Sequence, residues 1–259
     1  MSRNLLTGLV GAWCPSLGPS GYTLLDRSGR GNHGTLTNMD AASDWVGTPG
    51  GWALDYDGTN DYVQLDANNK FISTPLTLSG WINTTVSGGD TQNGIIASCE
   101  TAGGNANWAV TVNFLGGANK LNFWQTAGGS SLNSVTSVNT GVWIFWAVTR
   151  SAATTRIYIN GREDASVATG TPQTAGTQIT AIGRFGGFNG YHTPMQHGDI
   201  GIWHRTLQAP EIAVLYQTGM AGLGRLLTQR AQRRVFRTQA AVKSYLFVNR
   251  GQVIGGGTL

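Results

Sequence analysis

The stretch that decides the fold is residues 141–164, which read GVWIFWAVTRSAATTRIYINGRED. Its first part, 142–149, is apolar on both faces and rich in β-branched and aromatic residues, which predicts a central strand of a sheet covered on both sides. After a polar break at 150–154, residues 155–159 alternate between polar and apolar side chains, as in a half-buried strand. The run ends at Asn160-Gly161, the dipeptide most typical of a tight β-hairpin turn. This stretch therefore predicts an antiparallel sheet.

The rest of the chain repeats this pattern of short strands and turns. Only 12% of the residues are charged and 38 are glycine, which suits strands joined by tight turns. The segment 209–216, with Pro210 and Glu211 in its first turn, is the one clear helix. Further strands are expected at 5–13, 53–63 (two strands around an Asp-Gly turn), 76–84, 94–98, 108–114, 120–124, 178–183 and 198–203. We predict an all-β, two-sheet antiparallel sandwich with one short helix.

The charge is divided unevenly along the chain. Residues 222–259 hold seven of the 17 Lys and Arg residues and none of the 13 Asp and Glu residues. The net charge of +4 therefore combines a slightly acidic body with a basic tail. Such asymmetry is typical of a tail with its own partner, either an acidic surface or a nucleic acid. We predict a sandwich domain over residues 1–221 and a basic C-terminal arm over 222–259 that anchors the protein in an assembly.

The cysteines and the apolar runs bear on location. Cys14 and Cys99 could pair or remain buried free thiols, and the sequence leaves both alternatives open. No run approaches the roughly 20 apolar residues of a membrane span. Residues 5–14 lack the basic start and the small residues of a lipoprotein signal. We expect a protein without a signal on a virion surface, with an extracellular or cell-surface location as the alternative.

Six motifs resemble, in the same order, those of the laminin-G-like and concanavalin-A-like jelly-roll domains. They are residues 9–13 (LVGAW), 26–36 (DRSGRGNHGTL), 54–63 (LDYDGTNDYV), 78–82 (LSGWI), 155–161 (TRIYING) and 205–207 (RTL). The resemblance spans about residues 5–218 and leaves out the basic arm. It implies a jelly roll of two packed sheets, one of them concave, with a helix after the last strand.

The resemblance does not fix the activity, because the family contains sugar binders, adhesion modules, accessory domains of hydrolases and virion proteins. Hydrolases of this architecture place two or three carboxylates on one strand of the concave sheet. The body has only three glutamates, Glu100, Glu163 and Glu211, and none lies in such an arrangement. Asp55 and Asp57 have the right spacing but match the family's structural turn. We therefore predict a protein that is not an enzyme.

The resemblance also implies a structural Ca²⁺ between the glycine-rich loop at 26–36 and the last strand. Asp26, Asn32 and Asp199 would supply its oxygen ligands. Gly198 replaces the first acid of the family's acidic pair, which weakens a site that needs about six to eight oxygens. The alternative is that Asp26 and Asn32 cap a tight turn through the backbone. We expect no other cofactor.

A sugar site needs aromatic faces beside hydrogen-bonding groups, and the loop before the last strand offers both. The glycan-binding candidates are Arg184, Phe185, Phe188, Asn189, Tyr191 and His192. Trp45, Trp52 and Trp108 are further aromatic candidates. The alternative is that these rings cover the ends of the core.

The basic arm supplies the assembly residues, which are Arg230, Arg233, Arg234, Arg237 and Lys243. Nucleic-acid binding is not expected, because no aromatic stacking platform is interleaved with these residues. We predict a homo-oligomeric virion protein of the capsid-decoration or fibre type. Its arm binds other virion or surface proteins, and its displayed domain binds glycans. The alternatives are a bacterial carbohydrate-binding adhesion module and a glycoside hydrolase.

Overall fold

The computed structural model describes most of the chain. The described residues are 5–65, 70–72, 74–86, 93–100, 106–114, 117–125, 131–170, 177–185 and 191–229, without the side chain of Glu100. The chain divides into two units, Met1–Gly224 and Arg225–Leu259. Within the described ranges, no helix has the length and apolar character needed to cross a membrane.

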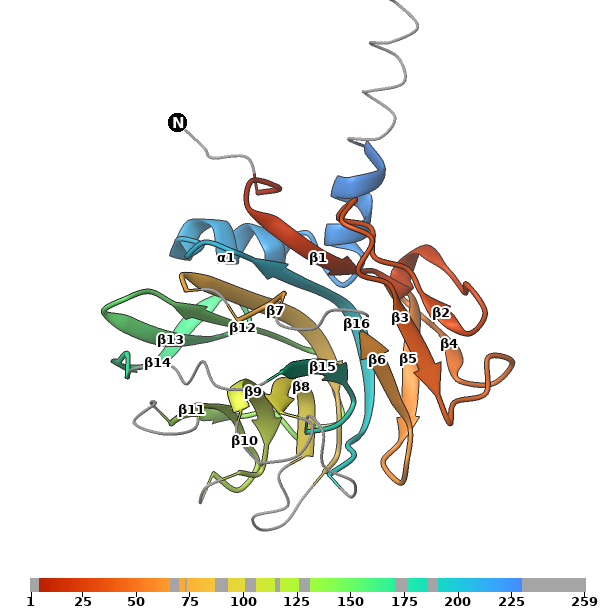
Figure 1. Ribbon diagram of the computed structural model, residues 1–259, viewed down its shortest axis with the longest axis horizontal. Coiled ribbons are helices and arrows are strands. Elements are labelled where there is room, and N and C mark those ends of the chain that lie inside the picture. The colour runs from red at the N-terminus through yellow and green to blue at the C-terminus, as the bar shows by residue number, and fades with distance from the viewer. Residues whose placement is uncertain are drawn as a thin grey trace, which may run out of the picture. The chain divides into compact units, whose positions relative to one another are not determined.

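Two antiparallel sheets of eight strands each form the first unit (Figure 1). Sheet A has the order β14-β13-β12-β7-β16-β5-β4, with β1 also paired to β16, and sheet B has the order β11-β10-β9-β8-β15-β6-β3-β2. The strands of sheet A are β1 (Leu9–Trp13), β4 (Trp45–Thr48), β5 (Gly51–Asp57), β7 (Leu76–Asn83), β12 (Ile144–Arg150), β13 (Thr154–Ile159), β14 (Arg162–Ala168) and β16 (Pro194–Trp203). Those of sheet B are β2 (Thr23–Leu24), β3 (Gly34–Thr37), β6 (Tyr62–Leu65), β8 (Asn93–Glu100), β9 (Ala106–Val112), β10 (Lys120–Trp124), β11 (Leu132–Ser137) and β15 (Gln178–Ile182). The predicted all-β sandwich is confirmed.

Within the described residues, the helical segments are short. The 3₁₀ helix η1 spans Pro15–Leu17 and the α-helix α1 spans Ala209–Gln217, and residues 222–229 form a further helical stretch. The helix α1 lies on the outer face of sheet A, where Tyr216 stacks on Trp81 with ring centroids 5.8 Å apart. The predicted helix is therefore confirmed.

The stretch 141–164 forms two consecutive hairpins in sheet A. β12 is paired on both sides, with β7 and with β13, as its apolar faces predict. Asn160 and Gly161 have φ angles of 49° and 78° and turn the chain into β14. The sequence did not predict β14, because this edge strand has a largely exposed, polar surface and no clear alternation.

Arg150 departs from the predicted polar break, because it belongs to β12 and is only 1% exposed. Alternation along the strand places its side chain on the same face as Trp146 and Val148, which are part of the core. None of its three side-chain nitrogens has a hydrogen-bond partner. Burial lowers the pKa of this guanidinium to about 10.

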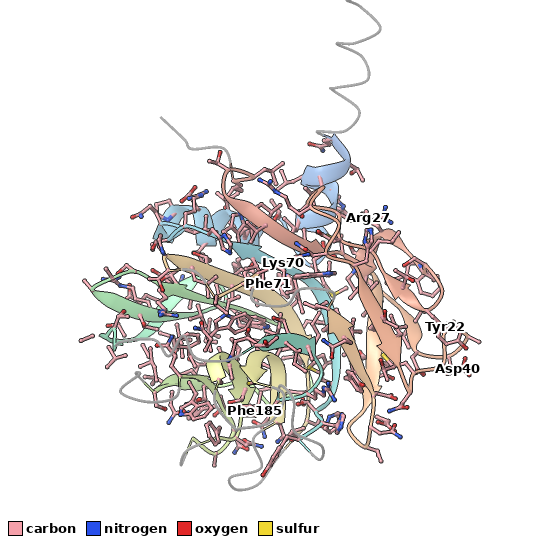
Figure 2. The ribbon with its side chains drawn as sticks, in the orientation of Figure 1. Tyr22, Arg27, Asp40, Lys70, Phe71 and Phe185 are labelled. Atoms are coloured by element: carbon pink, nitrogen blue, oxygen red, sulfur yellow. The ribbon has the colours of Figure 1, made fainter. Side chains whose placement is uncertain are left out.

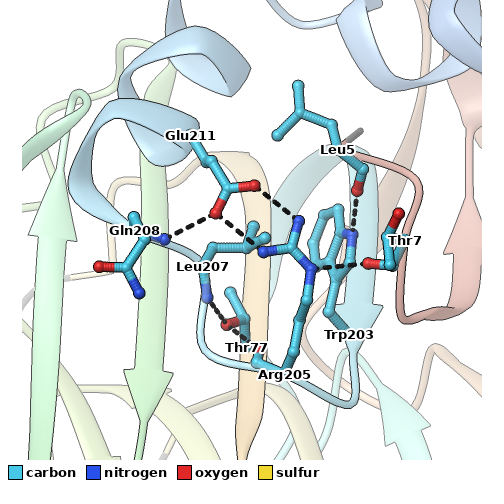
Figure 3. Close-up of polar contacts among 8 residues, drawn as sticks. All are labelled: Leu5, Thr7, Thr77, Trp203, Arg205, Leu207, Gln208 and Glu211. Atoms are coloured by element: carbon cyan, nitrogen blue, oxygen red, sulfur yellow. Dashed lines mark hydrogen bonds and ion pairs between the residues drawn. The ribbon is translucent and has the colours of Figure 1, made fainter. Parts of the chain in front are cut away.

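The corner between β16 and α1 is held by a dense polar network (Figure 3). Arg205 donates two hydrogen bonds to the Glu211 carboxylate, at 2.7 and 2.8 Å, and its Nε donates to the Thr7 carbonyl at 2.7 Å. Glu211 also accepts from the backbone N–H of Gln208 at 2.9 Å, at the start of the helix. Trp203 donates its indole N–H to the Leu5 carbonyl at 2.8 Å. This corner therefore ties the N-terminal strand region, the last strand and the helix together.

Candidate functional site

The outer face of sheet B carries a strip of small side chains. Ala97 of β8 lies opposite Ala109 of β9, and Cys99 and Ala106 continue the strip. Phe185 clusters with these four side chains and is itself only 2% exposed (Figure 2). The small residues thus leave room for one aromatic ring from the loop that follows β15.

The described ends of that loop, residues 183–185 and 191–193, are fixed to β8. The Gly183 N–H donates to the Ile95 carbonyl at 2.9 Å, and the Thr193 hydroxyl donates to the Gly94 carbonyl at 2.8 Å. A Cβ atom on Gly94 would lie 2.3 Å from the backbone carbonyl carbon of Arg184. Glycine at this position therefore lets the loop cross β8 in direct backbone contact.

Aromatic rings gather around Phe185. Its ring centroid lies 5.4 Å from that of Trp124, 5.9 Å from Phe114 and 6.3 Å from Tyr191. Phe114 is buried, whereas Trp124 and Tyr191 are only half-buried. Since Trp124 and Tyr191 reach the surface, they are the members of this cluster that can offer ring area to a ligand.

Several polar side chains lie beside the aromatic cluster. They come from β6 and from the same loop. The Arg184 guanidinium lies 3.7 Å from the centre of the Tyr62 ring, and its Nη2 donates to Gln64 Oε1 at 3.1 Å. The His192 ring lies 6.0 Å from that of Tyr62, and its Nδ1 is 3.2 Å from the Asp61 carbonyl oxygen. Burial lowers the pKa of Arg184, and the nearby Tyr62 opposes that shift.

Four of the six predicted glycan residues come together here, namely Arg184, Phe185, Tyr191 and His192. Phe188 and Asn189 lie outside the described residues. Phe185 does not present its ring as a stacking surface, because the strip and its aromatic neighbours bury it. Its role in the described structure is to hold the loop against the sheet.

Three neighbours of the site were not predicted from the sequence. Tyr62 and Gln64 alternate with the buried Val63 and Leu65 along β6, and Trp124 ends β10. The alternation of Tyr62 and Gln64 marked one face of a strand, but it did not indicate which loop would cover that face.

The further aromatic candidates divide between core and surface. Trp45 and Trp108 are buried and donate their indole N–H groups to the carbonyls of Gly21 and Phe71, at 3.0 and 2.7 Å. Their prediction as ligand platforms is therefore not supported by their positions. Trp52 is 40% exposed on β5.

The calcium candidates Asp26 and Asn32 cap a turn instead. Asp26 accepts hydrogen bonds from the backbone N–H groups of Ala12, Ser28 and Asn32 at 2.8 to 3.0 Å, and from the Ser28 hydroxyl. The Asn32 side-chain oxygen accepts from the Lys70 ammonium at 3.0 Å. Because donors already occupy these oxygens, and one donor is a cation, the loop does not fit a calcium ion in this arrangement.

Asp199, the third calcium candidate, binds the backbone that leads into the arm. Its carboxylate accepts from the Gly224 N–H at 2.8 Å and from the Ser16 N–H at 3.4 Å, and it is 3% exposed. A Cβ atom on Gly198 would lie 2.6 Å from Met220, so the residue before Asp199 has no room for a second acid. Across the described part of the chain, no three His, Cys, Asp or Glu side chains form a group that could hold a metal.

The remaining predictions concern the two cysteines and the basic arm. Cys14 and Cys99 are buried and are not joined in a disulfide, which is one of the two alternatives left open above. Burial raises the pKa of the Cys14 thiol well above its usual range. The predicted assembly residues, Arg230, Arg233, Arg234, Arg237 and Lys243, all lie beyond the described ranges.

The two packed sheets and the aromatic loop across sheet B define a lectin-like β-sandwich. The chain belongs to the concanavalin A-like lectin/glucanase superfamily, which it matches over residues 57–213. No curated protein matches the chain significantly in sequence.

Solved structures with a similar fold are distant in sequence. One is the sialidase of Trypanosoma rangeli, with a TM-score of 0.60 and 13% identity over 82% of this chain and 33% of the sialidase. Another is the binding domain of botulinum neurotoxin serotype D, with a TM-score of 0.61 and 15% identity over 83% of this chain and 52% of that domain. The binding domain of neurotoxin DC, solved in complex with SialylT, has a TM-score of 0.59 and 15% identity. The chain thus spans a third to a half of these proteins, and at such identities the likeness concerns the fold.

Proposed function

We propose that this protein is a non-catalytic, glycan-binding display module of a virion surface. The observation that carries glycan binding is the outer face of sheet B, where the half-buried rings of Trp124, Tyr191 and Tyr62 lie near hydrogen-bonding groups of Arg184 and His192. Sugars bind to such surfaces because their C–H faces pack on rings while their hydroxyls require polar partners. Membership of a lectin superfamily and the SialylT complex of the neurotoxin DC binding domain support the same class of ligand.

The side chains described on this face of sheet B support a non-catalytic role. Glycosidases need two acids about 5 to 10 Å apart across the scissile bond. Among the described side chains on the outer faces of β8, β9 and β10, none is a carboxylate. The nearby Asp61 accepts the backbone N–H of Asp57 in a turn. Hydrolysis of a bound oligosaccharide by the purified protein would contradict this part of the proposal.

The virion location is supported by the basic arm, which lies outside the family match and gives a displayed domain a means of attachment. In this proposal the protein forms homo-oligomers that attach to other virion proteins. The alternative is an adhesion module of a bacterium. Removal of residues 230–259, which leaves Asp199 and Gly224 intact, should prevent incorporation into particles. Normal incorporation of the truncated protein would rule out the arm as the anchor.

Glycan binding can be tested on an array and then by calorimetry with each ligand found. Trp124→Ala and Tyr191→Ala should each weaken binding by about fivefold to thirtyfold, since loss of a ring contact removes roughly 1–2 kcal/mol. Tyr22→Ala is the matched control, because Tyr22 is 60% exposed and takes no part in the aromatic cluster. Equal loss in all three variants would place the ligand elsewhere.

A further inference from the structure

We infer that the site selects glycans that carry a carboxylate, and that Arg184 is the residue that recognises the acidic group. This inference rests on the proposed function and names the class of sugar for the same site. Three features support it. They are the positive charge of the site, the incomplete hydrogen bonding of Arg184, and the partial exposure of the side chains around it.

Among the described residues, the Arg184 charge has no acidic partner. The described residues contain two ion pairs, Arg156 with Glu163 and Arg205 with Glu211, and neither includes Arg184. Its guanidinium contacts a neutral ring, that of Tyr62, and a neutral amide, that of Gln64. The site thus keeps a positive charge that its surroundings do not neutralise, although the side chain is 8% exposed. A charge held in this way favours an anionic ligand.

The hydrogen bonds of Arg184 are also incomplete. Nη2 donates to Gln64, whereas Nε is buried and has no acceptor. Guanidinium groups bind planar carboxylates through two parallel N–H donors, which gives both strength and geometric selectivity. A ligand carboxylate would therefore supply the hydrogen-bond acceptor that Arg184 Nε lacks in the protein.

The surroundings of Arg184 suit a sugar acid in particular. The Tyr62 ring lies against the guanidinium, and the His192 ring lies 6.0 Å from that of Tyr62. Both residues are half-buried, so this end of the site reaches the surface. The rings of Tyr191 and Trp124 contact that of Phe185, the residue that follows Arg184. A saccharide could then place its ring on an aromatic side chain and its carboxylate toward Arg184. Uronic and sialic acids share this chemistry.

Calorimetry with matched ligands tests the inference on the full chain. The pairs are trigalacturonic acid against its methyl ester, and sialyllactose against lactose. At least one acid should bind about tenfold more tightly than its neutral partner, as a charge-assisted hydrogen bond implies. The two pairs distinguish a uronic from a sialic acid. Equal affinity for acid and neutral partner in both pairs overturns the inference but leaves glycan binding intact, whereas no binding of any glycan overturns both.

Substitution of Arg184 tests whether this residue recognises the acidic group. Arg184→Gln should remove the preference for the acid, and Arg184→Lys should restore part of it. Arg162→Gln is the charge-matched control, because Arg162 is exposed on β14, and it should keep the full preference. If Arg184→Gln does not fold, the acid-against-ester comparison on the unchanged protein still decides the question. Retention of the full preference in a folded Arg184→Gln variant assigns the recognition to another group and overturns the role of Arg184.

Discussion

Two arginines stand near the two ends of β16, and their surroundings differ. Arg205, after the strand, donates to both Glu211 oxygens and to the Thr7 carbonyl. Arg184, in the loop before the strand, has one neutral hydrogen bond, one ring contact and an unpartnered Nε. A buried group that is fully paired contributes to stability and to a defined geometry, whereas an incompletely paired one calls for a further explanation. The difference separates a structural corner from a candidate binding site.

The largest effect should come from breaking the corner. Glu211→Ala removes the partner of Arg205 and the acceptor for the Gln208 N–H. The pair is largely buried, with side chains 12% and 13% exposed, so we expect the free energy of unfolding to fall by about 3 kcal/mol. Urea denaturation measures this value. Glu163→Ala is the control, since its pair with Arg156 is 36% and 44% exposed and should contribute less than about 1 kcal/mol. Similar losses in both variants would mean that burial does not set the strength of the corner.

Strand β16, between the two arginines, carries two buried titratable groups with opposite shifts. Burial raises the pKa of Asp199 to about 6 and lowers the pKa of His197 to about 4. Between about pH 4 and 6 the folded state holds an extra proton on Asp199, so that group's contribution to stability falls as pH rises. Over the same range the folded state lacks a proton on His197, so its contribution rises. The two trends should nearly cancel in the unchanged protein.

Single substitutions should expose each trend. Asp199→Asn should make stability increase from pH 4 to 6.5, and His197→Gln should make it decrease, by up to roughly 3 kcal/mol in each case, at about 1.4 kcal/mol for each unit of pKa shift. Urea denaturation at several pH values measures these slopes. Parallel slopes in the two variants would show that the groups do not oppose each other.

A substitution at Gly94 can disrupt the packing of the loop on β8 without changing the Arg184 side chain. Gly94→Ala would place a Cβ atom 2.3 Å from the Arg184 backbone, so the loop must move away from β8. We expect a loss of about 2 kcal/mol in stability, typical of overpacking, together with loss of glycan binding. Gly47→Ala on β4, which meets nothing within 4 Å, is the control and should change neither value. Intact glycan binding in a folded Gly94→Ala variant would separate the ligand site from the loop.

Arg150 extends the comparison to a cation with no hydrogen-bond partner at all. Because burying an unpaired charge is unfavourable, Arg150→Met should raise the free energy of unfolding by about 1–2 kcal/mol. Denaturation of the two proteins side by side measures the difference. A destabilised Arg150→Met variant would imply that the guanidinium has a partner that stabilises the fold.

The smallest effect concerns calcium. Donors already occupy the oxygens of Asp26, Asn32 and Asp199, so neither added Ca²⁺ nor EDTA should shift the melting temperature by more than about 1 °C. A clear rise with Ca²⁺ would show that a metal can displace these hydrogen bonds.

Sequence patterns predicted the fold well where they were local. The apolar run before Arg150 and the Asn160-Gly161 dipeptide indicated a central strand and a hairpin, because strand pairing and turn geometry depend on neighbouring residues. The edge strand β14 escaped prediction because its polar residues show no alternation. The buried position of Arg150 also could not be foreseen, since polar residues usually lie at the surface.

The site was predicted less completely. Glycine and aromatic residues indicated the loop that contains Arg184 and Tyr191, but not the burial of Phe185. That burial depends on small residues such as Ala97 and Ala109, which come from strands far away in the sequence. The partners of Asp199 were missed for the same reason, because the Gly224 N–H lies 25 residues further along the chain.

The bond between Asp199 and Gly224 also has a mechanical consequence. Any tension on the segment that follows Gly224 would be passed, through this carboxylate, to β16. That strand is paired with β7 on one side and with β5 and β1 on the other. An edge strand such as β14 or β4 can be peeled away one hydrogen bond at a time, whereas a strand paired on both sides must break many bonds together. A pull on the chain beyond Gly224 would therefore meet the combined resistance of a central strand rather than that of an edge.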